Sequence, residues 1–250
     1  MYVNRTYREA FSNKDLWGFR VIVRETDLYV SVDQASFSPD LEQKVEKLIL
    51  ALRYDLETYI SSDSEFKTTL QPHLLAPGAP VIARTMAAAA NTAGVGPMAA
   101  VAGAFAETIG RELLKLSSEV IVENGGDIFM ASPKKRLAGV FAGTSPFSGR
   151  LAVEVPPDKM PLGICTSSGT VGPSFSFGRA DATVIISRST ALADAAASAA
   201  GNAVQTGEDV KKGIEVAKSI PGVLGAVLIK DDKMAVWGEF NIVPVSPLNL

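Results

Sequence analysis

Asp194 and Ser198 lie four residues apart in an alanine-rich segment. Residues at this spacing share one face of a helix, so the carboxylate and the hydroxyl would point the same way. Together they could supply oxygen ligands for a Mg²⁺ ion that takes its other ligands from backbone carbonyls, water and phosphate. The alternative is an acidic residue near a helix N-terminus, where the helix dipole favours it by about 0.3–1 kcal/mol. If the alanines bury this helix, the carboxylate needs a partner.

Gly94 and Gly96 stand in a second segment, directly before Pro97. A proline suits the first turn of a helix, and a helix N-terminus presents unpaired N–H groups that can bind an anion. A helix that ends and restarts here would explain the same glycines. The segment has no lysine, so it is not a P-loop.

A third segment, 124–127, follows an apolar stretch that is typical of a strand. Gly125 and Gly126 have no Cβ, so a flat ligand or a phosphate could approach their backbone, with Asn124 or Asp127 as a polar contact. The alternative is a hairpin turn, because asparagine and glycine tolerate positive φ.

Ser167, Ser168 and Gly169 belong to a fourth segment, which is rich in hydroxyls and glycines and follows a predicted strand. Its hydroxyl and N–H groups could bind a phosphate or the edge of a ring. A solvated loop is the alternative. A nucleophilic serine or cysteine would need a base, and the single histidine, His73, lies in a proline-rich connector, which disfavours a Ser–His or Cys–His enzyme.

The composition limits the remaining classes. With 250 residues, 47% hydrophobic and 20% charged, the chain is expected to be a packed soluble protein. A net charge of −3 gives no basic surface for nucleic acid. One histidine and one cysteine (Cys165) exclude intrachain disulfides and zinc sites rich in cysteine or histidine, so any metal would rely mainly on oxygen ligands.

No membrane or secretion segment is expected. Residues 85–106 are uncharged, but asparagine, glycine and proline interrupt them and alanine contributes little apolar area. Residues 1–15 lack the apolar core of a signal peptide. These features predict a cytoplasmic protein that does not contact a membrane.

The elements that must position these residues follow from hydrophobic periodicity and turn residues. An irregular connector or lid is expected at 62–80, and an alanine-rich helix or turn before Gly94. Further helices are predicted at 38–61, 98–116, 190–204 and 209–219. Strands are predicted at 17–23, 28–32, 119–123, 127–131, 137–142, 151–155, 163–166, 183–187, 223–229 and 234–240. Hairpins dominate, which predicts a single α+β domain over 1–250 with a largely antiparallel sheet and helices packed on one face.

In this order and spacing the segments resemble the ApbE family, Mg²⁺-dependent flavin transferases that move FMN from FAD onto a threonine of a target protein. Residues 123–128, Glu-Asn-Gly-Gly-Asp-Ile, are similar to the family's Asn-x-Gly-Gly-Asp strand and turn. Residues 167–169 resemble its Thr-Ser-Gly, and residues 193–198 its Ala-Asp-Ala-x-Ala-Thr. The whole chain looks most like an uncharacterised family related to ApbE. The resemblance covers 85–205 well and the rest only by layout.

The resemblance implies a T-fold-like domain that binds FAD or FMN with Mg²⁺. It places Asp194 and Ser198 at the metal and implies a small-molecule nucleotide and an acceptor protein as partners. The residues expected at the flavin nucleotide are Gly94, Gly96, Asn124, Gly125, Gly126, Asp127, Ser167, Ser168 and Gly169. A homo-oligomer stays open, and no catalytic residue is assigned.

The chain departs from the family's motifs at two positions. Residues 94–99 stand where the family has Gly-Gly-Ile-Ala-Lys-Gly, and Pro97 or a neighbour replaces the lysine. Residues 175–179 read Phe-Ser-Phe-Gly-Arg where the family has a histidine in His-x-x-x-Pro, and no lipoprotein signal is present. Three functions therefore stay open: a flavin transferase, a non-catalytic flavin- or nucleotide-binding protein, and a metal-dependent enzyme that acts on another phosphorylated metabolite.

Overall fold

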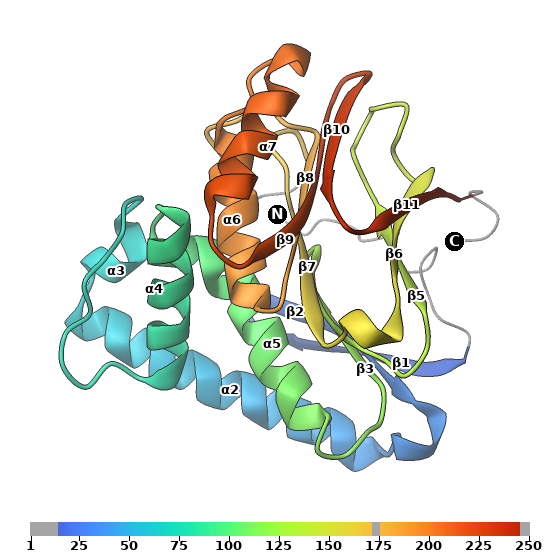
Figure 1. Ribbon diagram of the computed structural model, residues 1–250. Helices are drawn as coiled ribbons and strands as arrows, with labels where there is room; N and C mark the ends of the chain where they lie inside the picture. The colour runs from blue at the N-terminus through green and yellow to red at the C-terminus, as the bar shows by residue number, and fades with distance from the viewer. Residues whose placement is uncertain (1–14, 172–175, 246–250) are drawn as a thin grey trace.

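Two antiparallel sheets form the framework, and the helices gather on one side of the larger sheet (Figure 1). The computed structural model describes residues 15–171 and 176–245. The expectations about residues 1–14 and about residues 172–175 therefore lie outside the described residues. The α+β class and the antiparallel arrangement predicted from the sequence are confirmed.

The larger sheet has eight strands in the order β1-β2-β3-β4-β7-β8-β9-β10. All neighbours pair antiparallel, and the β3–β4 hairpin places Asn124 opposite Asp127. The strands are β1 (Leu16–Val23), β2 (Thr26–Asp33), β3 (Val120–Asn124), β4 (Asp127–Ala131), β7 (Leu162–Ser167), β8 (Ala182–Ser187), β9 (Val223–Lys230) and β10 (Lys233–Gly238).

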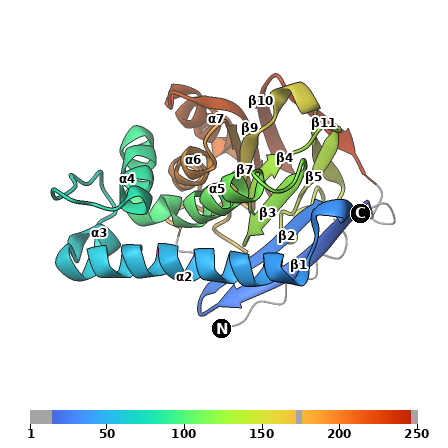
Figure 2. The ribbon, with the colours of Figure 1, turned by 90° about the horizontal axis from the view of Figure 1, so that it is seen from below.

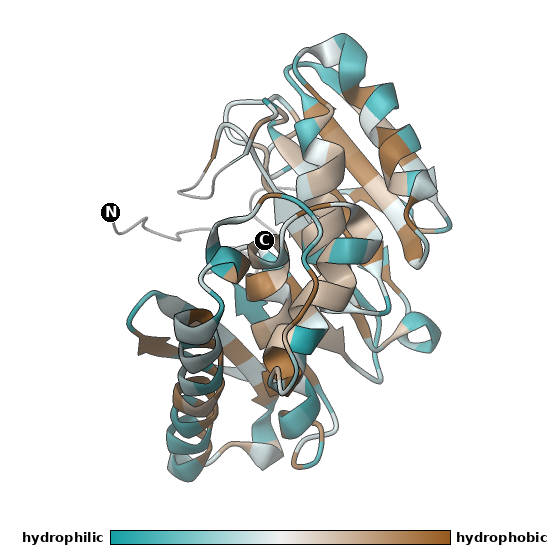
Figure 3. Ribbon diagram, turned by 90° about the vertical axis from the view of Figure 1, so that its left-hand side faces the viewer, coloured by the Kyte–Doolittle hydropathy of each residue, from teal (hydrophilic) through white to brown (hydrophobic). Residues whose placement is uncertain are grey.

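Helices cover one face of this sheet. In the view from below, α2 lies across β1 and β2 on this face (Figure 2). They carry hydrophilic residues alongside hydrophobic ones, as helices at a surface do (Figure 3). The α-helices are α2 (Pro39–Ser62), α3 (Glu65–Thr68), α4 (Val81–Ala93), α5 (Val101–Leu113), α6 (Thr190–Asn202) and α7 (Val210–Ser219). Short 3-10 helices are η1 (Gln34–Ser36), η2 (Pro97–Ala100), η3 (Pro157–Lys159) and η4 (Gly207–Asp209).

A second sheet of three strands covers the other face. It consists of β5 (Arg136–Val140), β6 (Leu151–Val155) and β11 (Asn241–Pro244) in the order β11-β6-β5. Val153 packs with Ile164 and Val184 of the larger sheet in a buried core. The strands at 137–142 and 151–155 were predicted, but β11 and the separation into two sheets were not.

Side chains on the central strands alternate between these two cores. Phe129 of β4 faces the helices and Met130 faces the small sheet. Since alternate residues of a strand share a face, Asp127 lies on the helix side with Phe129. Cys165 of β7 belongs to the helix-side core. The helix side of β4 and β7 therefore holds polar groups beneath α5 and α6.

Most predicted boundaries agree with the structure within a few residues. The helix predicted at 98–116 begins as η2 and continues as α5, which ends at Leu113. The connector at 62–80 contains the short helix α3. No helix among the described residues is long and apolar enough to span a membrane.

Candidate functional site

Two aspartates from distant parts of the chain meet where α5 begins. Asp194 lies on α6, and its Oδ2 accepts a hydrogen bond from the N–H of Gly103 at 2.8 Å. Asp127, at the start of β4, is buried and close enough for its charge to act on Asp194. We call Asp127, Asp194 and the first turn of α5 the carboxylate corner.

The carboxylate corner raises the pKa of Asp194 well above its ordinary value. The largest cause is desolvation of the half-buried Asp194 carboxylate, and the negative charge of Asp127 adds to it. The N–H groups of Gly103 and Ala102 act in the opposite direction. A positive charge placed here would favour the ionised form of Asp194.

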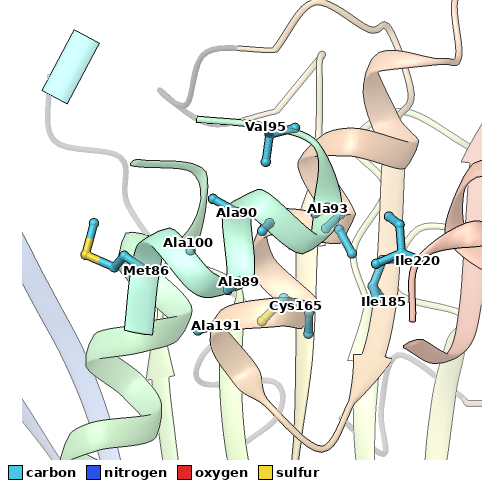
Figure 4. Packing of buried hydrophobic residues seen from close by; sticks show 14 of the residues in the cluster. Met86, Ala89, Ala90, Ala93, Val95, Ala100, Cys165, Ile185, Ala191 and Ile220 are labelled. Atoms are coloured by element: carbon cyan, nitrogen blue, oxygen red, sulfur yellow. The ribbon is translucent and has the colours of Figure 1, made fainter. Parts of the chain in front are cut away.

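The Cys165 thiol borders the carboxylate corner from the sheet side. Its Sγ donates to the carbonyl oxygen of Thr190 at 3.3 Å, and the side chain is buried in the alanine-rich core with Ala191 (Figure 4). Burial raises the pKa of Cys165 well above its usual range, and the charges of Asp127 and Asp194 raise it further. The thiol is therefore protonated and is not an activated nucleophile.

Glycines let the elements around the corner approach closely. A Cβ on Gly103 would overlap the carbonyl oxygen of Thr190 and lie 2.8 Å from the Cβ of Asp194. A Cβ on Gly163 of β7 would overlap the backbone of Thr190. The small residues of this region therefore bring α5, α6 and β7 together.

The segment 124–127 forms the hairpin turn that the sequence offered as one alternative. Gly125 and Gly126 have φ of 71° and 114°, which favour glycine. The Nδ2 of Asn124 donates to the carbonyl oxygen of Ala102 at 3.1 Å. The turn thus anchors Asn124 to the first turn of α5 and places Asp127 beside Asp194.

Gly94 and Gly96 have structural explanations of their own. Gly94 ends α4 with φ of 73°, and the N–H of Val95 donates to the carbonyl oxygen of Ala90 at 3.0 Å. A Cβ on Gly96 would overlap the carbonyl oxygen of Thr69 in the connector. The helix ends at Gly94 and restarts at η2, while contact of these glycines with a nucleotide stays a prediction.

Ser168 and Gly169 organise the loop after β7. The Oγ of Ser168 accepts hydrogen bonds from the N–H groups of Thr170 and Val171, at 3.1 and 2.9 Å. Gly169 donates its N–H to the carbonyl oxygen of Ala180 at 2.9 Å. These hydrogen bonds connect residues of the β7–β8 loop to one another. A ligand role for both residues stays a prediction.

Ser167 ends β7 close to α6, and Ser198 lies on α6 itself. The Oγ of Ser167 is 3.9 Å from the position of a Cβ on Gly201. Ser198 is one turn before Gly201 and one turn after Asp194 on the same helix, and it is partly exposed. The spacing of Asp194 and Ser198 on one helical face is therefore realised.

His73 is held in the connector, outside the carboxylate corner. Its ring Nε2 lies 2.8 Å from Oδ2 of Asp63, and its backbone N–H donates to Oδ1 of Asn91 at 2.9 Å. In the part of the chain that the structure describes, no group of three His, Cys, Asp or Glu side chains is arranged to hold a metal. A cation at Asp194 would therefore need hydroxyl, carbonyl, water or phosphate oxygens as well.

Glu107 of α5 was not identified from the sequence. Its Oε2 accepts the N–H of Thr190 at 2.7 Å, at the N-terminus of α6, while Oε1 accepts Nε of Arg111 at 2.9 Å. In the sequence, Glu107 and Arg111 have the spacing of an ordinary surface ion pair on a helix. Only the packing of α6 against α5 reveals the second role.

A family model described as "AbpE bacteria" matches residues 8–233. A UPF0280 protein of Methanosarcina acetivorans is 39% identical over 87% of this chain and 85% of its own length. A UPF0280 protein of Methanocella arvoryzae is 41% identical, over 87% and 86%.

Solved structures share the fold at low identity. The flavinyl transferase ApbE of Pseudomonas stutzeri, in its apo form, superposes with a TM-score of 0.59 at 15% identity, over 94% of this chain and 95% of that chain. The flavin transferase ApbE of Vibrio cholerae gives a TM-score of 0.58 at 12% identity, over 89% and 96%. The T-fold-like domain was expected from the resemblance to ApbE. These superpositions show the ApbE fold.

Proposed function

Because the chain belongs to the AbpE bacteria family, we propose that it binds FAD, or a related flavin nucleotide, together with Mg²⁺ at the carboxylate corner. The solved structures that share its fold are described as flavin transferases. Transfer of FMN to a protein acceptor is the activity that this likeness suggests for the bound nucleotide.

The observation that carries the proposal is the meeting of Asp127 and Asp194. Two carboxylates approach each other from β4 and α6, and burial together with the negative charge of Asp127 raises the pKa of Asp194. A divalent cation favours the ionised form of such a group, and two nearby negative charges attract the cation. The donors are all oxygen, which suits Mg²⁺.

Each residue of the carboxylate corner would have a separate role. Asp194 would hold the ion through its carboxylate, whose Oδ2 also accepts the N–H of Gly103. Ser198 offers a hydroxyl on the same helical face, and Asp127 adds negative charge. When bound, Mg²⁺ would neutralise charge on the pyrophosphate of the nucleotide. Asn124 holds the first turn of α5 in place through the carbonyl oxygen of Ala102.

Binding without turnover is the second candidate. The only histidine is engaged by Asp63, and the Cys165 thiol is protonated, so neither supplies a base or a nucleophile at the corner. The lysine and histidine of the ApbE motifs are also replaced in this chain. A metal-dependent reaction on another phosphorylated metabolite would use the same oxygen donors.

Calorimetric titration with FAD, with and without Mg²⁺, tests the binding. Asp194→Ala is expected to weaken FAD binding in Mg²⁺ by about 100-fold or more, with little effect in its absence. Asp232→Ala, an exposed aspartate in the β9–β10 turn, is the matched control and should behave like the wild type. Wild-type binding that is equal in Mg²⁺ and in EDTA contradicts the proposal.

A second experiment separates transferase from binder. In transfer, a hydroxyl of the acceptor forms a bond to the FMN phosphorus, the pyrophosphate P–O bond breaks, AMP leaves, and the hydroxyl proton passes to solvent. Incubation with FAD, Mg²⁺ and candidate acceptors would show covalent flavin fluorescence and AMP if transfer occurs. Binding without either product supports the non-catalytic candidate. A thermal-shift panel of other nucleotides and phosphorylated metabolites tests the third function, since ligands of the folded state raise its midpoint.

A further inference from the structure

Helices α5 and α6 pack against each other (Figure 1), and each supplies a carboxylate to the N-terminus of the other. The Oε2 of Glu107, from α5, accepts N–H groups of Thr190 and Ala191 in the first turn of α6, at 2.7 and 3.4 Å. It also accepts the hydroxyl of Ser189 at 3.2 Å. These N–H groups have no acceptor within their own helix, so Glu107 satisfies them.

Asp194 does the same in the opposite direction. It belongs to α6, and its Oδ2 accepts the N–H of Gly103 in the first turn of α5. Gly103 must be a glycine here, because a Cβ would overlap the carbonyl oxygen of Thr190. Each helix thus supplies the carboxylate that caps the other.

The two contacts lie one turn apart. Gly103 and Glu107 are four residues apart on α5, and Thr190 and Asp194 are four apart on α6. Gly103 pairs with Asp194, and Glu107 pairs with Thr190, so the two helices cross with opposite directions along this face. One contact alone would allow α6 to pivot about it, whereas two contacts separated by about 5.4 Å fix its direction.

We propose that Glu107 is a positioning residue, which acts through the N-terminus of α6 to hold the Asp194 carboxylate against Gly103. Its link to Mg²⁺ affinity rests on the proposed function. Glu107 itself is nearly buried and holds Arg111 with its other oxygen. It does not need to touch the ion or the nucleotide. Its contribution is to keep Oδ2 of Asp194 on the N–H of Gly103, which fixes the direction of the carboxylate.

Amide hydrogen exchange of the metal-free protein tests the positioning role directly. Glu107→Ala is expected to speed exchange at Gly103 by roughly fivefold to tenfold, as well as at Thr190 and Ala191. Glu107→Gln keeps an acceptor oxygen and should leave Gly103 within about twofold of the wild type. Glu112→Ala is the matched control, because Glu112 pairs with Lys115 on the exposed face of α5.

Faster exchange at Thr190 and Ala191 with unchanged exchange at Gly103 would overturn the proposal, because Glu107 would then be only a local cap. Unchanged exchange at all three amides would overturn it as well. If the alanine variant does not fold, Glu107→Met tests the same point, since it keeps the length of the side chain, removes the acceptor and should expose Gly103.

The link to the cation is measured separately by FAD titration at several Mg²⁺ concentrations. Glu107→Ala should weaken the apparent Mg²⁺ affinity by roughly tenfold and add nothing in an Asp194→Ala background. An unchanged Mg²⁺ affinity in Glu107→Ala contradicts that link. If the wild type shows no Mg²⁺-dependent binding, the proposed function fails, while the exchange experiment still decides the positioning role.

Discussion

Two regions of the molecule place carboxylates beside other charged groups, and they shift the pKa of a carboxylate in opposite directions. On the small-sheet side, Arg136 of β5 pairs with buried Glu119 and with Asp15, which we call the ion-pair network. Arg136 and Lys134 lower the pKa of Asp15. In the carboxylate corner, burial and Asp127 raise the pKa of Asp194 instead.

The difference separates a structural role from the proposed binding role. Ion pairing in the network gives its carboxylates partners within the protein and connects β5 to the residues that directly precede β1 and β3. The corner brings two negative side chains together at a cost to folding, which a bound cation would offset. A raised pKa favours the neutral form of a carboxylic acid, and such shifts gather at functional sites. The raised pKa on these closely packed elements marks the carboxylate corner as the candidate site.

The largest expected effect is on the ion-pair network. Arg136→Ala leaves Glu119 buried with its charge unpaired, and we expect a loss of about 3–5 kcal/mol in the free energy of unfolding. Chemical denaturation measures this loss. Lys135→Ala, which removes an exposed pair with Glu154, should cost less than about 1 kcal/mol. Equal losses would contradict the role assigned to Arg136.

Gly103→Ala should destabilise the corner by about 1–3 kcal/mol, because the new methyl group meets backbone of α6 that cannot move freely. Thermal or chemical unfolding gives the value. Gly207→Ala is the control, since its nearest neighbour is the mobile side chain of Lys233, 2.8 Å from the added Cβ. A Gly103→Ala protein as stable as the control would show that α5 and α6 are not tightly held together.

Asp194→Asn should have opposite effects with and without the cation. The amide oxygen can still accept the N–H of Gly103, while the charge facing Asp127 disappears. We expect the metal-free protein to gain about 1 kcal/mol of stability at neutral pH. Denaturation in EDTA measures this gain, and titration with Mg²⁺ should show weaker binding. Destabilisation in EDTA would mean that the Asp194 charge is already compensated.

The smallest expected effect is on the pH profile of stability. The pKa of Asp194 is raised in the folded state, so its contribution favours folding at low pH and is lost as pH rises from about 4 through the folded pKa. The pKa of Asp15 is lowered, so its contribution is present above about pH 4 and is lost as pH falls through the folded pKa. Denaturation of metal-free protein at a series of pH values should show that Asp194→Asn flattens the first trend and Asp15→Asn the second. The reverse assignment would contradict the contrast between the two regions.

Much of the fold could be predicted from the sequence because it depends on local patterns. Alternating apolar residues mark β1 and β2, and the three- and four-residue spacing from Leu41 to Leu56 marks α2. The turn at Gly125 and Gly126 needs positive φ, which adjacent glycines permit. The strand β11 is short and half exposed, so it has little periodicity to detect.

The candidate site could be predicted only in part. The motifs drew attention to Asp127 and Asp194, and the structure brings them together. Ser168 and Gly169 directly follow β7, and their hydrogen bonds stabilise the β7–β8 loop. Their residue types alone do not reveal this role. Glu107 was not singled out, because its spacing to Arg111 is that of an ordinary surface ion pair on a helix.

The sequence by itself determined the α+β class, the scarcity of cysteine and histidine and the local geometry of the glycine turn, because these depend on composition and on neighbours along the chain. Only the tertiary structure decided that Asp194 reaches Gly103, which lies 91 residues away, and that Glu107 returns the contact. The physical reason is that close approach of two helices depends on every small residue between them, and a carboxylate's pKa depends on what that approach brings near it.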